Sequence, residues 1–117
     1  MSHARQAGHL AASCQSASYF GRFVVVVDDD IDPTNLWEVI WSMSTRCDPA
    51  EDIDIIRKTW SGPLDPRIPR GAATNSRGIV FACRPYEMIK DFPPVARASK
   101  ELRAKVEEKF KDALSKL

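Results

Sequence analysis

A run of one aromatic residue and four valines, Phe23 to Val27, constrains the fold of this chain most strongly. β-Branched and aromatic side chains favour strands, and the run lacks the alternation typical of a strand with one face in water. It is also far too short to span a membrane. We therefore predict a central strand that is buried on both faces, as in parallel sheets covered by helices.

The rest of the chain predicts helices and strands around this run. Asp32-Pro33 has the form of a helix start, because Asp accepts from free N–H groups and Pro lacks the donor that would be left unpaired. Apolar residues at helical spacing follow, and Asp48-Pro49 is expected to end this helix. The other segments predict a helix over residues 2–18, strands over 53–60 and 78–83, and an amphipathic C-terminal helix from Ser99 with a stripe of Leu102, Val106, Phe110, Leu114 and Leu117.

The order of these elements predicts the fold class. At 117 residues the chain has the size of one domain. A strand, a helix and a second strand in succession favour a βαβ unit with a right-handed crossover. We expect a single α/β domain over residues 1–117, with a two- or three-layer βαβ sheet, flanking helices and a C-terminal helix.

Composition excludes several classes of protein. Seventeen Lys and Arg against sixteen Asp and Glu give a net charge of +1, so no field of one sign favours nucleic acid or an anionic membrane. Cys14, Cys47 and Cys83 have neither zinc-site spacing nor the even number of a disulfide framework. The N-terminus has no signal-peptide pattern. We expect a cytoplasmic protein that has no membrane span and binds no nucleic acid.

Four aspartates follow the valine run, and we call them the aspartate cluster: Asp28, Asp29, Asp30 and Asp32. Hard cations prefer several carboxylate oxygens in one loop, but an EF-hand loop from Asp28 would need Gly and Glu where the chain has Pro33 and Val39. A looser magnesium site remains open. In the alternative interpretation, Asp30 or Asp32 caps the helix and the others solvate the end of the strand. Ligands of open α/β sheets bind at the carboxyl ends of strands, so the position keeps functional interest.

Other motifs give weaker indications. His3 and His9 are six residues apart, which does not place both on one helix face as a metal pair would require. The segment "RGAATNSRG" has no glycine pattern of a phosphate-binding loop, although Arg77 is the basic residue best placed to meet an anion. Trp37 and Trp41 form a second stripe on their helix, which indicates either a partner surface or internal packing.

Three segments in order carry a family resemblance: "FVVVVDDDIDPTNLWEVIWSMSTRCDPAEDIDII", "GPLDP" and "SRGIVFACRP". Together they resemble the C-terminal domain of UbiD-type decarboxylases, which carry a V-V-D-x-D-I-D-P run, a helix ending in T-R-x-x-P and a later strand preceded by a basic residue. The segment "HARQAGHLAAS" is similar to the helix before this run in the family. The resemblance covers residues 3–117.

The resemblance implies a reaction and its cofactors. The family carries out reversible non-oxidative decarboxylation of aromatic and α,β-unsaturated acids, with prenylated flavin mononucleotide, a divalent metal and potassium. The acid–base residues and the metal ligands of the family belong to regions outside this domain. We therefore expect no catalytic residue, no metal ligand and no bound cofactor in this chain alone.

The resemblance also implies roles for particular residues. The aspartate cluster corresponds to a family motif that shapes the strand-to-helix turn. Arg77 matches the position of a basic residue that contacts the cofactor phosphate, and Phe81 and Cys83 are candidates to line the substrate cavity.

Three functions follow as hypotheses. The first is a C-terminal domain or subunit of a UbiD-like carboxy-lyase, inactive alone, that forms homo-oligomers or joins a larger catalytic subunit carrying the flavin. The second is a stand-alone assembly module that associates through the tryptophan-bearing helix and the C-terminal helix. The third is a small domain that binds a divalent metal at Asp28 to Asp32.

Overall fold

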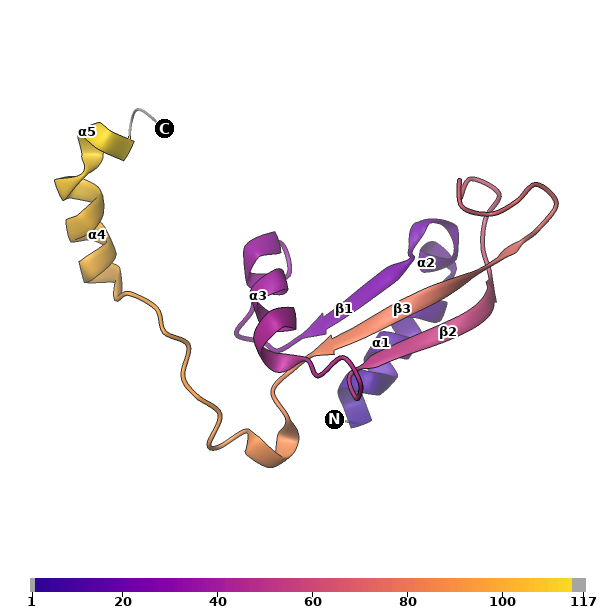
Figure 1. Cartoon of the computed structure of the whole chain (residues 1–117), viewed down its shortest axis with the longest axis horizontal. Coiled ribbons are helices and arrows are strands. Elements are labelled where there is room, and N and C mark those ends of the chain that lie inside the picture. Colours follow the sequence, from indigo (N-terminus) through magenta and orange to yellow (C-terminus); the bar gives the residue numbers. More distant parts are fainter. Residues whose placement is uncertain (1, 115–117) are drawn as a thin grey trace.

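The computed structural model describes residues 2–114. Figure 1 shows a small sheet with helices packed around it and a C-terminal arm that extends away. The elements in chain order are α1 (Ser2–Ser13), α2 (Gln15–Phe20), β1 (Phe23–Val27), α3 (Leu36–Arg46), β2 (Ile53–Trp60), β3 (Thr74–Ala82), the 3₁₀-helix η1 (Tyr86–Met88), α4 (Lys100–Lys109) and α5 (Lys111–Leu114). No helix within 2–114 is long and apolar enough to cross a membrane.

The sheet is mixed, with strand order β1-β3-β2. β1 runs parallel to β3, with Val25 opposite Val80, and β2 runs antiparallel to β3, with Ile55 opposite Gly78. The α/β class is therefore confirmed. The expected right-handed crossover from the first strand to the second is wrong, because β2 runs in the opposite direction and β3 lies between the two.

β3 takes the central place that was predicted for the valine run. Its carboxyl half and the residue after it are buried without interruption, from Ile79 to Cys83. β1 lies at the edge of this sheet, where its valines are half-buried and Phe23 is exposed. The prediction of a central first strand is therefore wrong for this sheet, since the more deeply buried β3 pairs with both neighbours.

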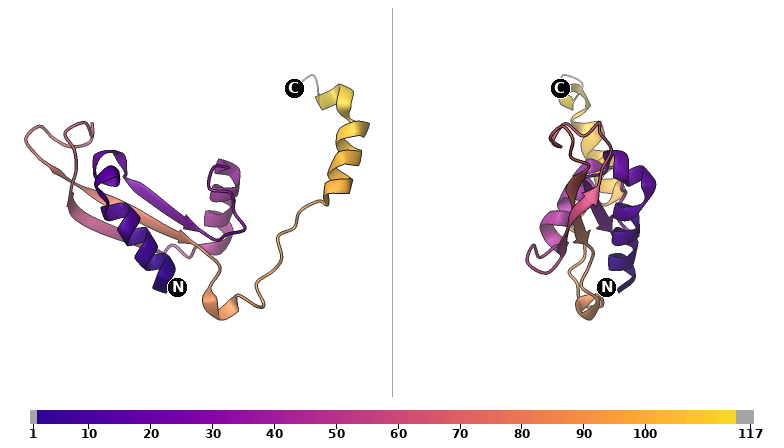
Figure 2. Two further views of the ribbon diagram at one scale, coloured as in Figure 1. Left: turned by 180° about the vertical axis from the view of Figure 1, so that it is seen from behind. Right: turned by 90° about the vertical axis from the view of Figure 1, so that its right-hand side faces the viewer.

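α1 packs against one face of the sheet, as Figure 2 shows. A Cβ added at Gly8 would lie 2.8 Å from side-chain atoms of both Ile79 and Phe81. Ala12 is buried in the same core cluster. The predicted helix over residues 2–18 is instead two helices, which break at Cys14, where the backbone is extended.

α3 begins later than the Asp32-Pro33 motif predicts. Asn35 caps it, with its side-chain oxygen accepting from the Trp37 N–H at 3.1 Å. Asp32 instead accepts from the N–H and the hydroxyl of Thr34, at 2.9 and 2.7 Å, and so forms a turn before the helix. Asp32 therefore accepts its hydrogen bonds three residues before Asn35, the residue that caps α3.

The C-terminal arm, residues 84–114, leaves the sheet after β3. Ser99 caps α4 by accepting from the Leu102 N–H, which confirms the predicted start of this helix. Leu102 and Val106 on α4, and Phe110 directly after it, are about half exposed. Leu117, the end of the predicted stripe, lies outside the described residues. The radius of gyration is 19.0 Å, against about 13 Å for a compact chain of this length.

Candidate functional site

The aspartate cluster lies at the carboxyl ends of β1 and β3, where α3 also ends. Arg46, at the end of α3, donates through Nη1 to Asp28 Oδ2 at 2.7 Å and to Asp30 Oδ1 at 2.8 Å. Its Nη2 donates to Asp30 Oδ2 at 2.8 Å, so Arg46 and Asp30 form a bidentate ion pair. The Arg46 side chain is only 1% exposed. One buried guanidinium therefore ties the strand end to the helix end.

A second arginine, Arg84, which follows β3, also binds Asp28. The backbone N–H of Arg84 donates to Asp28 Oδ2 at 2.9 Å, and its Nε donates to the same oxygen at 3.2 Å. Asp28 thus links β1, α3 and the first residues of the C-terminal arm. Asp29 points into solvent.

Electrostatics in this cluster stabilises the charged forms. The hydrogen bond from Arg46 holds the pKa of Asp30 below its usual value, and the same bond raises the pKa of Arg46. The Arg46 guanidinium also lies 5.2 Å from the centroid of the Trp41 ring. Within residues 2–114 no group of three or more His, Cys, Asp or Glu side chains is arranged to hold a metal. The two most enclosed carboxylates are already neutralised, which supports a structural role for the cluster.

Cys83 lies at the same end of the sheet and is buried. Its Sγ is 3.6 Å from the carbonyl oxygen of Val26, and burial raises the pKa of the thiol to about 11. The thiol therefore stays protonated at neutral pH and is a poor nucleophile.

Phe81 is fully buried beneath α1. The Arg5 guanidinium lies 4.9 Å from the centroid of its ring, and the His9 ring lies 6.4 Å away. The expectation that Phe81 and Cys83 line a substrate cavity stays a prediction. Phe81 can reach such a cavity only if α1 moves.

Arg77 lies six residues earlier on β3, about 20 Å from Cys83 along the strand. It is 2% exposed. Its Nη1 donates to the Ala12 carbonyl at 2.6 Å, its Nη2 to the Trp60 carbonyl at 2.9 Å, and its Nε to the Thr59 hydroxyl at 3.1 Å. The structure therefore does not bring Arg77 together with Cys83.

The surroundings of Arg77 bear on the implied flavin. Each of its guanidinium nitrogens already has a neutral acceptor, and helix α1 and strand β2 supply them. A cofactor phosphate would have to displace these contacts. The described residues do not fit a flavin phosphate by themselves, and the phosphate contact of Arg77 stays a prediction.

A polar cluster that the sequence did not reveal joins α1 to β2. Arg5 Nη1 donates to both carboxylate oxygens of Asp54 at 3.0 and 3.1 Å, and His9 Nε2 is 2.9 Å from Asp54 Oδ2. Hydrogen bonds from His9 and Arg5 hold the pKa of Asp54 below its usual value. The spacing of Arg5 and His9, at i and i+4 on one helix face, was the signal that could have indicated a shared partner.

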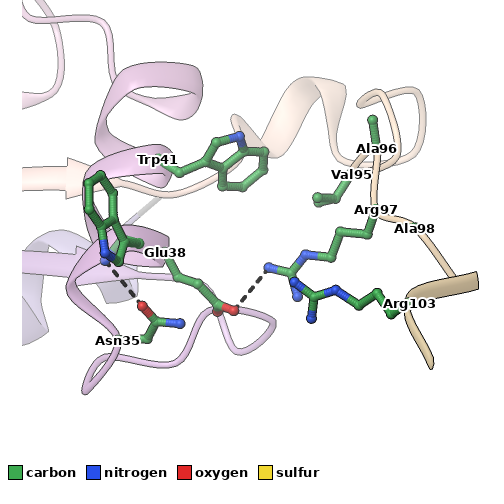
Figure 3. Close-up of a pocket in the computed structure, with 9 residues that line it drawn as sticks. Asn35, Glu38, Trp41, Val95, Ala96, Arg97, Ala98 and Arg103 are labelled. Carbon is green, nitrogen blue, oxygen red and sulfur yellow. Dashed lines mark hydrogen bonds and ion pairs between the residues drawn. The ribbon is translucent and has the colours of Figure 1, made fainter. Parts of the chain in front are cut away.

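A groove opens between α3 and the C-terminal arm, and Figure 3 shows it in close-up. Its volume is about 570 Å³. Arg97 crosses from the arm to α3, where its Nη2 lies 3.3 Å from Glu38 Oε1. No sequence pattern indicated this groove, because the arm before α4 has no periodic pattern. The lining residues are Asn35, Trp37, Glu38, Trp41, Val95, Ala96, Arg97, Ala98 and Arg103.

Comparison with known families identifies the domain. Residues 1–83 match the family model of the 3-octaprenyl-4-hydroxybenzoate carboxy-lyase C-terminal domain, and this span contains the three strands, the aspartate cluster and Arg46. The chain belongs to this family, the UbiD C-terminal domain. A phenolic acid decarboxylase from Sedimentibacter hydroxybenzoicus is 43% identical over 47 residues, which are 40% of this chain and 10% of that protein.

Solved UbiD-class enzymes share the fold of this domain. The enzyme HmfF from Pelotomaculum thermopropionicum, in complex with FMN, superposes with a TM-score of 0.70 at 25% identity, over 84% of this chain and 21% of that one. The vanillic acid decarboxylase of Sedimentibacter hydroxybenzoicus in open form gives 0.69 at 27% identity, over 96% of this chain and 24% of that one. The latter enzyme is also known in a closed form. This UbiD C-terminal domain spans about a quarter of the solved relatives and a tenth of the curated one.

Proposed function

We propose that the chain serves as the C-terminal domain or subunit of a UbiD-like non-oxidative decarboxylase acting on aromatic or α,β-unsaturated carboxylic acids. The observation that carries this proposal is the family match over residues 1–83. It is supported by relatives that are named as decarboxylases of phenolic and vanillic acids. In the full enzyme, the prenylated FMN of the family would supply the electron sink for loss of carbon dioxide.

The isolated chain is proposed to be inactive. Decarboxylation needs groups that can exchange protons with the substrate near neutral pH. Asp28 and Asp30 are bound to arginines, and Cys83 holds its proton well above neutral pH. The chain also covers only about a quarter of the solved relatives. The remaining groups are therefore proposed to come from regions outside residues 1–117.

Within such an enzyme the domain is proposed to close one wall of the active-site cleft and to contribute to subunit contacts. A sheet face with exposed apolar residues supports this, since Phe23 on β1 and Ile55 on β2 both lie open to solvent. Cofactor contact through Arg77 and cavity lining by Phe81 and Cys83 are part of this proposal. All three are buried, so each requires a shift of α1 or of the arm.

Capture from the native host tests this function. The tagged chain should retain a larger polypeptide with a flavin absorption spectrum, identified by intact mass. Ile55→Lys, on the open sheet face, should reduce that capture, whereas Leu64→Lys, which is also exposed but lies in the β2–β3 loop, should not. A chain that elutes alone and colourless contradicts the subunit function. Turnover of benzoate or cinnamate by the pure chain contradicts the proposed inactivity.

A second candidate function, an assembly module, is favoured by two apolar faces that no other segment within residues 2–114 covers. Leu36 and Ile40 form an exposed pair on α3, and Leu102, Val106 and Phe110 form a stripe along α4 and its C-cap. In a symmetric dimer, a second copy of the chain could cover both faces. Light scattering should then give a dimer that Val106→Glu converts to a monomer, while Glu108→Lys, outside the stripe, has no effect. A wild-type monomer at high concentration excludes this function.

A further inference from the structure

The groove between α3 and the arm has the size and lining of a ligand site. Its volume of about 570 Å³ lies within the roughly 300–1,000 Å³ typical of small-molecule pockets. Figure 3 shows Trp41 and Glu38 on α3 facing Arg97 and Arg103 across the opening. Aromatic walls and guanidinium groups therefore meet at one place, from segments some sixty residues apart in sequence.

One arginine of the groove is used to hold it together. Arg97 pairs with Glu38 at 3.3 Å, and this contact fixes the arm against α3. The pair also cancels the negative charge of Glu38. Glu38 further accepts from the Asp32 N–H at 3.0 Å, so its carboxylate is tied to the turn before the helix.

The other arginine is available. Arg103, on the first turn of α4, has no acidic partner among residues 2–114, and it leaves the groove with one unbalanced positive charge. Trp37 lines the α3 side of the same groove and is 84% exposed, and no ring or cation packs on it in this part of the chain. An open indole on the α3 wall and an unpaired guanidinium on the opposite wall offer a stacking surface and an anion contact within one groove.

We propose that this groove binds a planar aromatic carboxylate, with the carboxylate on Arg103 and the ring against Trp37 and Trp41. Guanidinium and carboxylate form paired hydrogen bonds, and the indoles offer flat apolar faces to the ring. The site goes beyond the proposed function, because it includes none of Arg77, Phe81 and Cys83. A neutral aromatic compound lacks the first contact, and a saturated acid lacks the second.

Titration of the full chain with 2-naphthoate tests the proposal. Calorimetry gives the affinity, and the indole N–H signals of Trp37 and Trp41 in NMR spectra show whether binding occurs in the groove. We expect 2-naphthamide and cyclohexanecarboxylate each to bind about tenfold more weakly than 2-naphthoate, because the first lacks the charged contact and the second lacks the stacking contact. Trp60, on β2, serves as the internal reference, and its signal should stay unchanged.

Matched variants separate this site from unspecific attraction of an anion. Arg103→Gln should weaken 2-naphthoate binding about tenfold. Arg67→Gln removes the same charge from the β2–β3 loop and should leave the affinity unchanged. Both residues are exposed, so folding is retained.

Three results would overturn the proposal. They are equal affinity for the amide and the acid, equal affinity of Arg103→Gln and wild type, and the absence of any shift at Trp37 and Trp41 up to millimolar ligand. The experiment uses neither flavin nor a larger polypeptide. Its failure would leave the proposed function intact, and capture of a flavin-bearing partner would say nothing about this groove.

Discussion

Arg46 is the residue on which the candidate site depends. It is buried, and its two terminal nitrogens serve two carboxylates on the preceding loop. Replacing Arg46 with Met should destabilise the chain by roughly 2–3 kcal/mol, somewhat below the full effect of breaking a buried ion pair because Asp30 is partly solvated. Urea unfolding measures the change.

Arg84 provides the control for that variant. Arg84→Met leaves the backbone N–H on Asp28 and removes only a partly exposed side chain, so about 1 kcal/mol or less is expected. Equal losses for the two variants would contradict the central place of Arg46.

The stabilisation by the Arg46–Asp30 ion pair should depend on pH. Because Arg46 holds the folded-state pKa of Asp30 below its unfolded value, the stabilisation is complete above about pH 4 and is lost as the pH falls through the folded-state pKa. The difference in unfolding free energy between wild type and Arg46→Met should therefore shrink from pH 6 to pH 2. A difference that stays constant over this range would show that packing, rather than charge, accounts for the loss.

The cysteines should differ in reactivity because they differ in burial. Burial raises the pKa of Cys83 to about 11, whereas Cys14 is exposed. At pH 7.5, iodoacetamide should label Cys14 first, and Cys83 should react only after unfolding. Peptide mass mapping over time checks this order, and early labelling of Cys83 would mean that the arm opens readily.

At the scale of elements, the packing of α1 on the sheet depends on a missing side chain. Gly8→Ala would place a methyl group 2.8 Å from Ile79 and Phe81, and both are fully buried. We expect a loss of about 1–3 kcal/mol in unfolding free energy from overpacking. Gln6→Ala, on the exposed side of the same helix, should change stability by less than about 0.5 kcal/mol. Thermal melts of both variants make the comparison.

Sequence patterns predicted where the strands lie along the chain, but not their order in the sheet. The valine run and "GIVFAC" were sufficient to find β1 and β3, because runs of apolar and β-branched residues are local signals. Which strand lies in the centre depends on pairing between segments more than fifty residues apart, and no local pattern records it. The same reason hid the partners of the aspartate cluster, since Arg46 becomes a neighbour of Asp28 only when α3 folds back.

At the scale of the whole molecule, the C-terminal arm is the separable part. α4 has no buried residue, and the segment that leads to it contains Pro93 and Pro94. Limited trypsin digestion should cut at Arg97 or Lys100 and leave the sheet domain folded. The shortened product should unfold within about 0.5 kcal/mol of the intact chain, because exposed residues contribute little. A product that unfolds on cleavage would show that the arm supports the core.

The strand order also determines when the sheet can form during synthesis of the chain. β1 and β2 leave the ribosome first, but neither can pair with the other, because β3 lies between them and ends only at Ala82. A nascent chain of seventy residues therefore holds two strands, β1 and β2, that have no partner strand. Contacts of such long sequence separation form slowly and leave strand edges open to other chains. A nascent chain of this protein should need shielding from its neighbours until its third strand emerges.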